Sequence, residues 1–151
     1  HEYTASDIVR FSQEARRKIN EKYPDMFIHP ENETIRDVSH MLWTGDPIDP
    51  TSSGRNAVFY GDKAIDRSPC GTGTSARIAQ LHAKGKLKKG EEYVHESFIG
   101  SKFIGRIEEE TTLDGKVAVV PSIQGWAKVY GYNNIIIDDE DDPYAHGFQV
   151  I

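Results

Sequence analysis

The 151-residue chain is 28% charged and 37% hydrophobic, a balance that indicates one globular domain with its own core and excludes a disordered chain. Its net charge of −6, without a long basic run, argues against a nucleic-acid partner. No apolar stretch approaches the roughly 20 residues of a membrane-spanning helix, no signal peptide is evident, and one cysteine cannot form an internal disulfide. We therefore expect a cytoplasmic protein that does not bind a membrane.

The first predicted element is a helix from Thr4 to Tyr23. Apolar residues recur in it at intervals of three or four positions, at Ile8, Phe11, Ala15 and Ile19. Thr4 and Asp7 have the spacing of a capping box, and Pro24 ends the helix. Such a one-sided apolar stripe is typical of a helix that lies on a sheet.

Short strands are predicted next, at residues 26–28, 38–43, 56–60 and 63–66, with a loop from 44 to 55. The Gly61-Asp62 pair predicts a tight turn that joins the last two strands into a hairpin. His40 lies inside the apolar run of the second strand. A lone histidine in such a place usually makes a structural hydrogen bond, and a role in lining a pocket is the less common alternative.

The hairpin leads into the most informative stretch, residues 66–76, which runs from a strand end through a tight turn into a helix predicted over residues 74–84. A helix start leaves backbone N–H groups without partners and carries the positive end of the helix dipole. Gly71 and Gly73 lack a Cβ, so an anion can approach the backbone closely there. This setting generally favours a thiolate, and Cys70, the only cysteine, lies directly before Gly71. The turn therefore predicts an anion cradle beside a reactive sulfur.

The helix that follows the turn is small and apolar around most of its circumference, so we expect its burial on several sides. More strands are predicted at residues 93–99, 102–107, 117–120, 126–130 and 133–137, and Asp114-Gly115 predicts a hairpin turn. A buried helix among strands indicates an α+β fold with a sheet wrapped around the helix. The acidic run 138–142 lacks the ligand spacing of a calcium loop, so we predict a solvated loop and no metal site.

Three chemistries are compatible with the turn. Residues 71–76 have the spacing of a dinucleotide-binding fingerprint, although the strand-rich chain lacks alternating β and α units. Alternatively, Cys70 is the nucleophile of a hydrolase, with its base among His40, His95 and His146. His82 lies about three helical turns from the cysteine, too far to pair with it. The third chemistry is proton transfer at a carbon next to a carboxylate, and only this hypothesis uses every feature of the turn.

The stretch 66–76 resembles the second cysteine motif of the proline racemase family. Further stretches are similar to the second half of that family, at residues 83–87, 95–97, 131–133 and 142–148. Residues 39–45 and 55–61 resemble the 4-hydroxyproline epimerase branch in particular. The resemblance implies a fold like that of diaminopimelate epimerase, in which each of two lobes wraps a mixed β-barrel around a central helix. The active site lies between the lobes, and one cysteine from each exchanges the Cα proton without a cofactor.

The resemblance also implies roles for individual residues. Cys70 is expected to be one catalytic acid/base, and Gly71 and Thr72 to bind the substrate carboxylate through their N–H groups. Asp66 is expected to contact the nitrogen of the substrate ring. His40 and Tyr60 are expected to line the ring pocket.

This sequence departs from the family in length and in its cysteines. Members of the family are about twice as long, and their first-lobe motif, a cysteine followed by glycine and histidine, is absent because Cys70 is the only cysteine. We therefore expect residues 1–151 to form a single second lobe, with about 138–151 as a tail that returns toward the first lobe. The expected partners are that first lobe with its cysteine, a hydroxyproline or proline substrate and a second copy of the protein in a homodimer.

The expected activity is the interconversion of trans-4-hydroxy-L-proline and cis-4-hydroxy-D-proline, with the single lobe inactive alone. A related dehydratase branch has threonine in place of the cysteine, so Cys70 argues for a racemase or an epimerase. The alternatives are a proline racemase of the same family and a non-catalytic module that binds imino acids. A nicotinamide-binding domain is the least favoured hypothesis.

Overall fold

The structure is a computed structural model that describes residues 3–148. Two helices and eight strands are formed within these residues: α1 (Ala5–Lys22), β1 (Ile28–His29), β2 (Asn32–Arg36), β3 (Met41–Gly45), β4 (Gly54–Tyr60), β5 (Ala64–Ile65), α2 (Gly71–Ala83), β6 (Glu92–Glu96), β7 (Lys102–Leu113) and β8 (Lys116–Gln124). Strand β2 was not predicted from the sequence, and β7 and β8 are longer than expected. Among the helices of the described residues, none has the length and apolar character needed to cross a lipid bilayer.

Helix α1 begins as its sequence predicts. The hydroxyl of Thr4 accepts a hydrogen bond from the backbone N–H of Asp7, and the carboxylate of Asp7 accepts one from the backbone N–H of Thr4, both at 3.2 Å. This reciprocal pair is the capping box. The helix packs on β3, β4 and β5. Its buried Ser12 accepts a 2.8 Å hydrogen bond from the indole N–H of Trp43.

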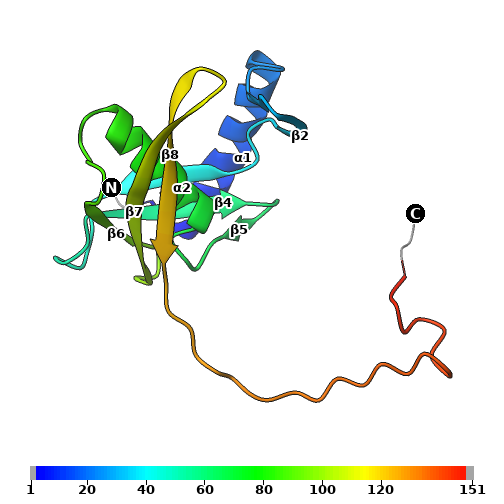
Figure 1. Cartoon of the computed structure of the whole chain (residues 1–151). Coiled ribbons are helices and arrows are strands. Elements are labelled where there is room, and N and C mark those ends of the chain that lie inside the picture. Colours follow the sequence, from blue (N-terminus) through cyan, green and yellow to red (C-terminus); the bar gives the residue numbers. More distant parts are fainter. Residues whose placement is uncertain (1–2, 149–151) are drawn as a thin grey trace.

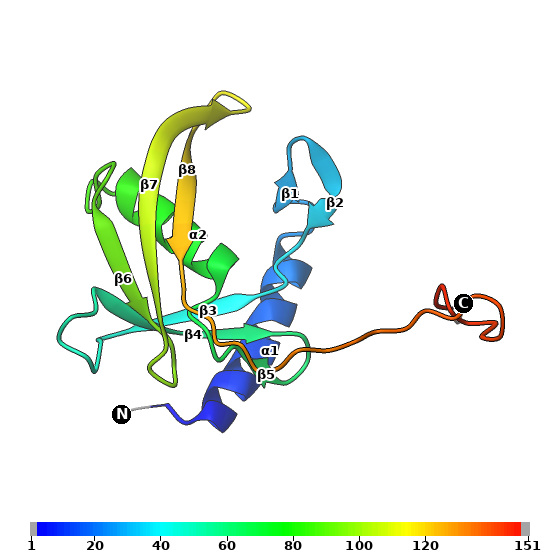
Figure 2. The same cartoon turned by 60° about the horizontal axis from the view of Figure 1, so that its bottom comes forward.

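The main sheet has the strand order β3-β4-β6-β7-β8, and β5 pairs with β4 as the predicted hairpin. Its neighbours are antiparallel except for the parallel pair β4–β6, so the sheet is mixed. The α+β class is confirmed. Figures 1 and 2 show the sheet curving around α2, which lies on its inner side. In the described residues β3 and β8 remain open edges, so closure into a barrel stays a prediction.

Helix α2 is buried on one face only, which corrects the expectation of burial on several sides. Thr74 and Ile78 face β7 and β8 and are fully buried, and Ile78 joins Leu87, Tyr93 and Ile107 in the core. The opposite face, with Thr72, Ala76 and Gln80, is exposed. The exposure arises because the sheet is open on that side.

The predicted strands 126–130 and 133–137 are wrong for this chain. From residue 126 to 148 the described tail has turns but no helix or strand, and it extends away from the body (Figure 1). The β-branched and aromatic residues of these stretches suit a strand, but a strand forms only where a neighbouring edge supplies hydrogen-bond partners. The acidic run 138–142 is exposed, as predicted.

Candidate active site

Cys70 is the N-cap residue of α2, which begins at Gly71, three residues before the predicted helix start. Its sulfur accepts a hydrogen bond from the backbone N–H of Gly73 at 3.3 Å and lies 3.4 Å from the hydroxyl oxygen of Thr72. The backbone of Cys70 has φ of 66°, a left-handed value that L-residues other than glycine rarely adopt. The sulfur therefore lies at the positive end of the helix dipole, in a conformation that its surroundings must hold.

A chain of hydrogen bonds links Cys70 to strand β4. The backbone N–H of Asp66 donates to the carbonyl of Val58 at 2.8 Å. One carboxylate oxygen of Asp66 accepts from both the N–H and the hydroxyl of Ser68, each at 2.9 Å. The Ser68 hydroxyl oxygen in turn accepts from the N–H of Cys70 at 3.1 Å. Asp66 thus shapes the turn through Oδ1, and Oδ2 has no hydrogen-bond partner within residues 3–148.

The two glycines of the turn have different surroundings. A Cβ on Gly73 would lie 3.0 Å from Cδ1 of Leu42 and 3.2 Å from Cβ of Cys70, so a side chain there would push against the cysteine. A Cβ on Gly71 would meet no atom within 4 Å. The N–H groups of Gly71 and Thr72 find no acceptor among the described residues. Two amides at a helix start therefore face open space beside the sulfur, which is the arrangement that binds anions.

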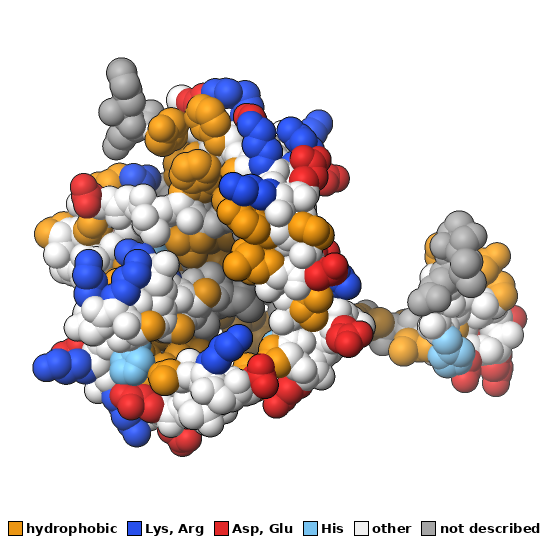
Figure 3. Space-filling view, turned by 90° about the horizontal axis from the view of Figure 1, so that it is seen from above, with side chains coloured by type: hydrophobic (Ala, Val, Ile, Leu, Met, Phe, Trp, Pro, Cys, Tyr) orange, Lys and Arg blue, Asp and Glu red, His pale blue; other side chains and the backbone are white. Residues whose placement is uncertain are grey.

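Cys70, Thr72 and His40 line one pocket of about 560 Å³ between β3, β4 and the exposed face of α2. Its remaining walls are apolar at Leu42, Val58 and Ala76 and cationic at Arg77 and Lys84. Viewed from above, the molecule is hollowed at its centre, with hydrophobic side chains inside the hollow (Figure 3). The pocket has the Cys70 sulfur at one side and room for a small ring.

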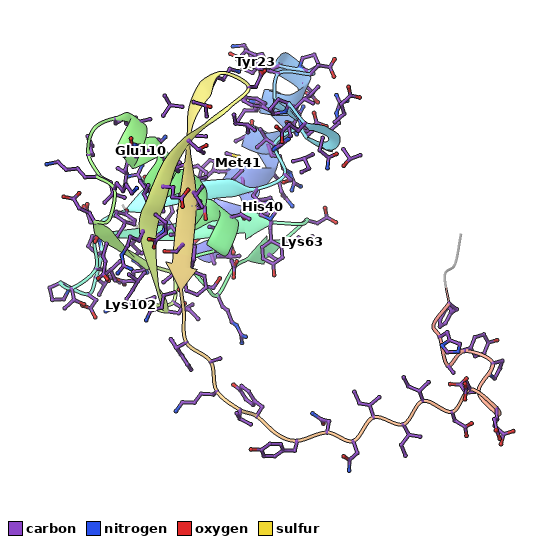
Figure 4. All side chains as sticks on the ribbon, in the orientation of Figure 1. Tyr23, His40, Met41, Lys63, Lys102 and Glu110 are labelled. Atoms are coloured by element: carbon purple, nitrogen blue, oxygen red, sulfur yellow. The ribbon has the colours of Figure 1, made fainter. Side chains whose placement is uncertain are left out.

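His40 lines the pocket, and its ring stacks on Tyr60, which is not among the residues that line this pocket. The rings of His40 and Tyr60 are 6.1 Å apart between centroids and 14° from parallel. Figure 4 labels His40 at the start of β3. Arg16 of α1 donates from Nη1 to the carbonyls of Ser39, at 3.0 Å, and Gly61, at 2.7 Å. Because these carbonyls adjoin His40 and Tyr60 in the chain, Arg16 ties both ends of the stack together, a role that no pattern in the sequence indicated.

The geometry does not form a cysteine–histidine pair. No histidine is a hydrogen-bond partner of Cys70 within residues 3–148. Nδ1 of His40 contacts the Ser39 hydroxyl at 2.8 Å, and His146 lies in the extended tail. His95 is fully buried under the turn, where burial and, to a smaller extent, the charge of Arg77 lower its pKa to about 4.

The dinucleotide hypothesis also lacks its structural context. That fingerprint needs a parallel strand leading directly into the helix. The strand before α2 is β5, which has two residues and runs antiparallel to β4. The spacing of glycines in residues 71–76 therefore reflects the cysteine turn.

The fold and the site define an α+β protein that places one cysteine and two free amides of a helix start at an open pocket. The sequence profile of the proline racemase family matches residues 1–149. The chain belongs to that family.

Named relatives and solved structures agree with this assignment. The chain is 61% identical over 149 residues to the 4-hydroxyproline 2-epimerase of Spirosoma linguale and 59% identical over 149 residues to the 4-hydroxyproline epimerase of Brucella ovis. Each match covers 99% of this chain and 44% of the relative, so the chain spans less than half the length of these proteins.

Two crystal structures are similar to the chain in fold. A hydroxyproline epimerase from Agrobacterium vitis, with bound trans-4-hydroxy-L-proline, has a TM-score of 0.75 and 33% identity over 95% of this chain and 40% of its own. A probable proline racemase from Agrobacterium radiobacter, with bound carbonate, has a TM-score of 0.76 and 34% identity over 95% of this chain and 41% of its own.

Proposed function

We propose that this chain provides one half of the active site of a 4-hydroxyproline epimerase that works without a cofactor. The complete enzyme interconverts trans-4-hydroxy-L-proline and cis-4-hydroxy-D-proline. The observation that carries the proposal is the placement of the Cys70 sulfur beside the unpaired amides of Gly71 and Thr72. The names of the similar proteins support hydroxyproline as the substrate class.

The substrate carboxylate binds the N–H groups of Gly71 and Thr72. The open space at Gly71 lets the carboxylate approach the backbone, and the helix dipole stabilises its charge. Removal of the Cα proton moves further negative charge onto the carboxylate oxygens. The same two N–H groups then stabilise the enediolate more strongly than the substrate, which lowers the barrier.

Cys70 exchanges the Cα proton on one face of the substrate. As a thiolate it removes the proton, and as a thiol it returns one in the reverse direction. Inversion requires a second acid/base on the opposite face, which we assign to a cysteine of the first lobe. The second carboxylate oxygen of Asp66, which lies outside the pocket lining, is assigned to the ring nitrogen. His40, held by its stacking on Tyr60, forms part of the wall that the ring faces.

We assign residues 1–151 to the second lobe of the enzyme and residues from about 138 to the returning tail, of which 149–151 lie outside the described residues. Support comes from the large apolar side chains that residues 126–148 expose, including Trp126, Tyr130 and, within the returning tail, Phe148. Apolar surface of this extent is normally covered by a partner.

The test is a chimera in which residues 1–149 replace the matching segment of the Spirosoma linguale epimerase. Chiral chromatography should show epimerisation of trans-4-hydroxy-L-proline by the chimera and none by the 151-residue chain alone. In the chimera, Cys70→Ser should abolish turnover while calorimetry still detects the ligand.

Each alternative has its own outcome. Faster turnover of proline than of hydroxyproline by the chimera would assign a proline racemase. Full activity in Cys70→Ser would show that Cys70 is not an essential acid/base. Ligand binding by an inactive chimera would support a non-catalytic imino-acid-binding module, and turnover by the isolated chain near the rate of the chimera would contradict the two-lobe mechanism.

A further inference from the structure

Three buried polar side chains meet under the cysteine turn. They come from three elements: Asn56 from β4, Thr74 from α2 and His95 from β6. Thr74 and His95 are 0% exposed and Asn56 is 3% exposed. Asn56 and Thr74 contact the carbonyl of Pro69, the residue before Cys70, and Nδ1 of His95 contacts both of these side chains. We call them the Pro69 clamp.

The clamp has five polar contacts. The amide nitrogen of Asn56 donates to the Pro69 carbonyl at 2.7 Å and lies 3.2 Å from Nδ1 of His95. The hydroxyl of Thr74 lies 3.2 Å from the Pro69 carbonyl and 3.0 Å from the same Nδ1. The backbone N–H of Thr74 donates to the carbonyl of Cys70 at 2.9 Å.

The protons and lone pairs of the side chains match when His95 is neutral. The Asn56 amide supplies two protons and the Thr74 hydroxyl one. The Pro69 oxygen has two lone pairs, and an unprotonated Nδ1 has one. With the ring proton on Nε2, Nδ1 accepts from Asn56 or from Thr74, whose single proton also faces the Pro69 carbonyl. Oδ1 of Asn56 has no hydrogen-bond partner within residues 3–148.

Thr74 holds the peptide groups on both sides of the Cys70 Cα. Its hydroxyl contacts the carbonyl of Pro69, and its N–H binds the carbonyl of Cys70. The orientations of these two groups set the backbone angles of Cys70, including its φ of 66°. A strained value of this kind persists only where the surroundings over-determine it.

We propose that Asn56, Thr74 and His95 are positioning residues that hold Cys70 in its left-handed conformation and thereby keep its sulfur on the Gly73 N–H. This inference rests on the proposed function for its consequence, because an acid/base sulfur must be aimed to within a fraction of an ångström. The clamp itself touches neither the pocket nor the sulfur.

Two further observations support the clamp. The lowered pKa of His95 keeps the ring neutral at physiological pH, as the proton match requires. Nε2 of His95 is buried and has no hydrogen-bond partner within residues 3–148. A buried N–H without a partner costs stability, so packing alone does not account for a histidine here.

The experiment measures the alkylation of Cys70 by iodoacetamide in the 151-residue chain between about pH 6 and 10. Since Cys70 is the only cysteine, the rate reports on one thiol. Two pairs of variants separate the hydrogen bond from the change in side-chain size. In the first pair, Thr74→Val removes the hydroxyl and Thr74→Ser keeps it. In the second pair, His95→Leu removes the polar atom at the position of Nδ1, and His95→Asn keeps one near that position.

The other charged groups around the sulfur are the same in all four variants. They are His40 from the start of β3, Arg77 and Lys84 from α2, and Asp66 through Ser68. Differences between the pH profiles therefore report on the clamp alone.

We expect Thr74→Val and His95→Leu to move the midpoint of the alkylation profile upward by about one pH unit, which slows alkylation roughly tenfold below the midpoint. Thr74→Ser and His95→Asn should stay close to the parent. If Thr74→Val and His95→Leu only loosen the fold, the plateau rate of alkylation and the urea midpoint change but the pH midpoint does not. That result overturns the proposal. This readout needs no substrate, so it is independent of whether the chimera is active.

Discussion

The sulfur of Cys70 lies 3.3 Å from the backbone nitrogen of Gly73, so the cysteine caps the helix that it precedes. Helix caps are normally Ser, Thr, Asp or Asn, whose oxygens accept well from N–H groups. A neutral thiol is a weak acceptor, whereas a thiolate is a strong one. The capping position therefore stabilises the thiolate relative to the thiol, and the thiolate is the form that removes a proton.

This contact depends on the absence of a side chain at position 73. In Gly73→Ala, the new Cβ pushes Leu42 and Cys70, so we expect a loss of about 1–3 kcal/mol in the free energy of unfolding, as overpacking typically costs. Gly71→Ala is the matched control, because its Cβ meets open space and its stability should not fall. Urea denaturation of both chains checks this difference.

The same pair of variants separates folding from binding. In the chimera, Gly71→Ala should raise the KM for hydroxyproline because its methyl group lies where the carboxylate approaches. If Gly71→Ala leaves KM unchanged, the substrate carboxylate does not bind at this helix start.

His95 should make the chain sensitive to mild acid. Its pKa is about 4 in the folded chain, against about 6.5 when unfolded, so between these pH values only the unfolded chain binds the proton. Stability contributed by neutral His95 is therefore present above about pH 6.5 and lost as the pH falls toward 4, by about 3 kcal/mol over the full interval. Urea titrations at both ends of the interval should show this loss in the parent and not in His95→Asn.

Carboxylates contribute in the same direction but cancel in that comparison. Hydrogen bonds from Lys102 and Thr51 hold the pKa of Asp49 below its usual value of 3.8, so its contribution is lost only as the pH falls below that value, under the interval of the comparison. It is present in both proteins. An equal loss of stability in the parent and in His95→Asn would show that His95 is protonated in the folded chain.

Local signals in the sequence predicted much of this fold. The capping box of Thr4 and Asp7 and the turn at Asp114-Gly115 depend only on neighbouring residues, and both are formed. Asp114 and Gly115 have φ of 49° and 71°, the paired positive values that a tight hairpin turn requires. The cysteine turn was placed correctly for the same reason, since proline and glycine restrict or free the backbone locally.

What the sequence did not predict depends on contacts between distant residues. Asn56, Thr74 and His95 are 18 to 39 residues apart and follow no periodic pattern, so their convergence under the cysteine turn has no local signal. The helix begins at Gly71, not Thr74, because the sulfur of Cys70 and the clamp fix a segment that glycine alone would leave free. The exposed face of α2 has a composition that suits burial, and only the open side of the sheet leaves it uncovered.

Arg16 should affect substrate binding without touching the substrate. Arg16→Met removes the two hydrogen bonds that hold the Ser39 and Gly61 carbonyls, so the stack of His40 and Tyr60 should loosen. In the chimera we expect KM to rise severalfold with little change in kcat, because the ring pocket and not the acid/base is disturbed.

The neighbouring Arg17 is the control for this prediction. Its ion pair with Glu21 is exposed, so Arg17→Met should leave KM unchanged. The free energy of unfolding should change by no more than about 0.5 kcal/mol. A fall in kcat at constant KM in Arg16→Met would mean that Arg16 influences the chemical step.

The tail should be dispensable for the body of this chain. Residues 126–148 are exposed almost throughout and form no strand, so a chain that ends at Gly125 should keep the thermal midpoint of the parent. A chain that ends at Pro121 is the matched control. It loses the β8 residues that pair with Ile104 to Arg106 of β7, and its midpoint should fall.

Truncation should also change self-association. The tail exposes Trp126, Tyr130, Tyr132 and Ile136 by 72% to 98%, and exposed apolar side chains in this density promote association. Sedimentation velocity should therefore show larger species for the full chain than for the chain ending at Gly125. If truncation at Gly125 lowers the thermal midpoint as much as truncation at Pro121, the tail packs on the body of its own chain, and it is then not free to return to a first lobe.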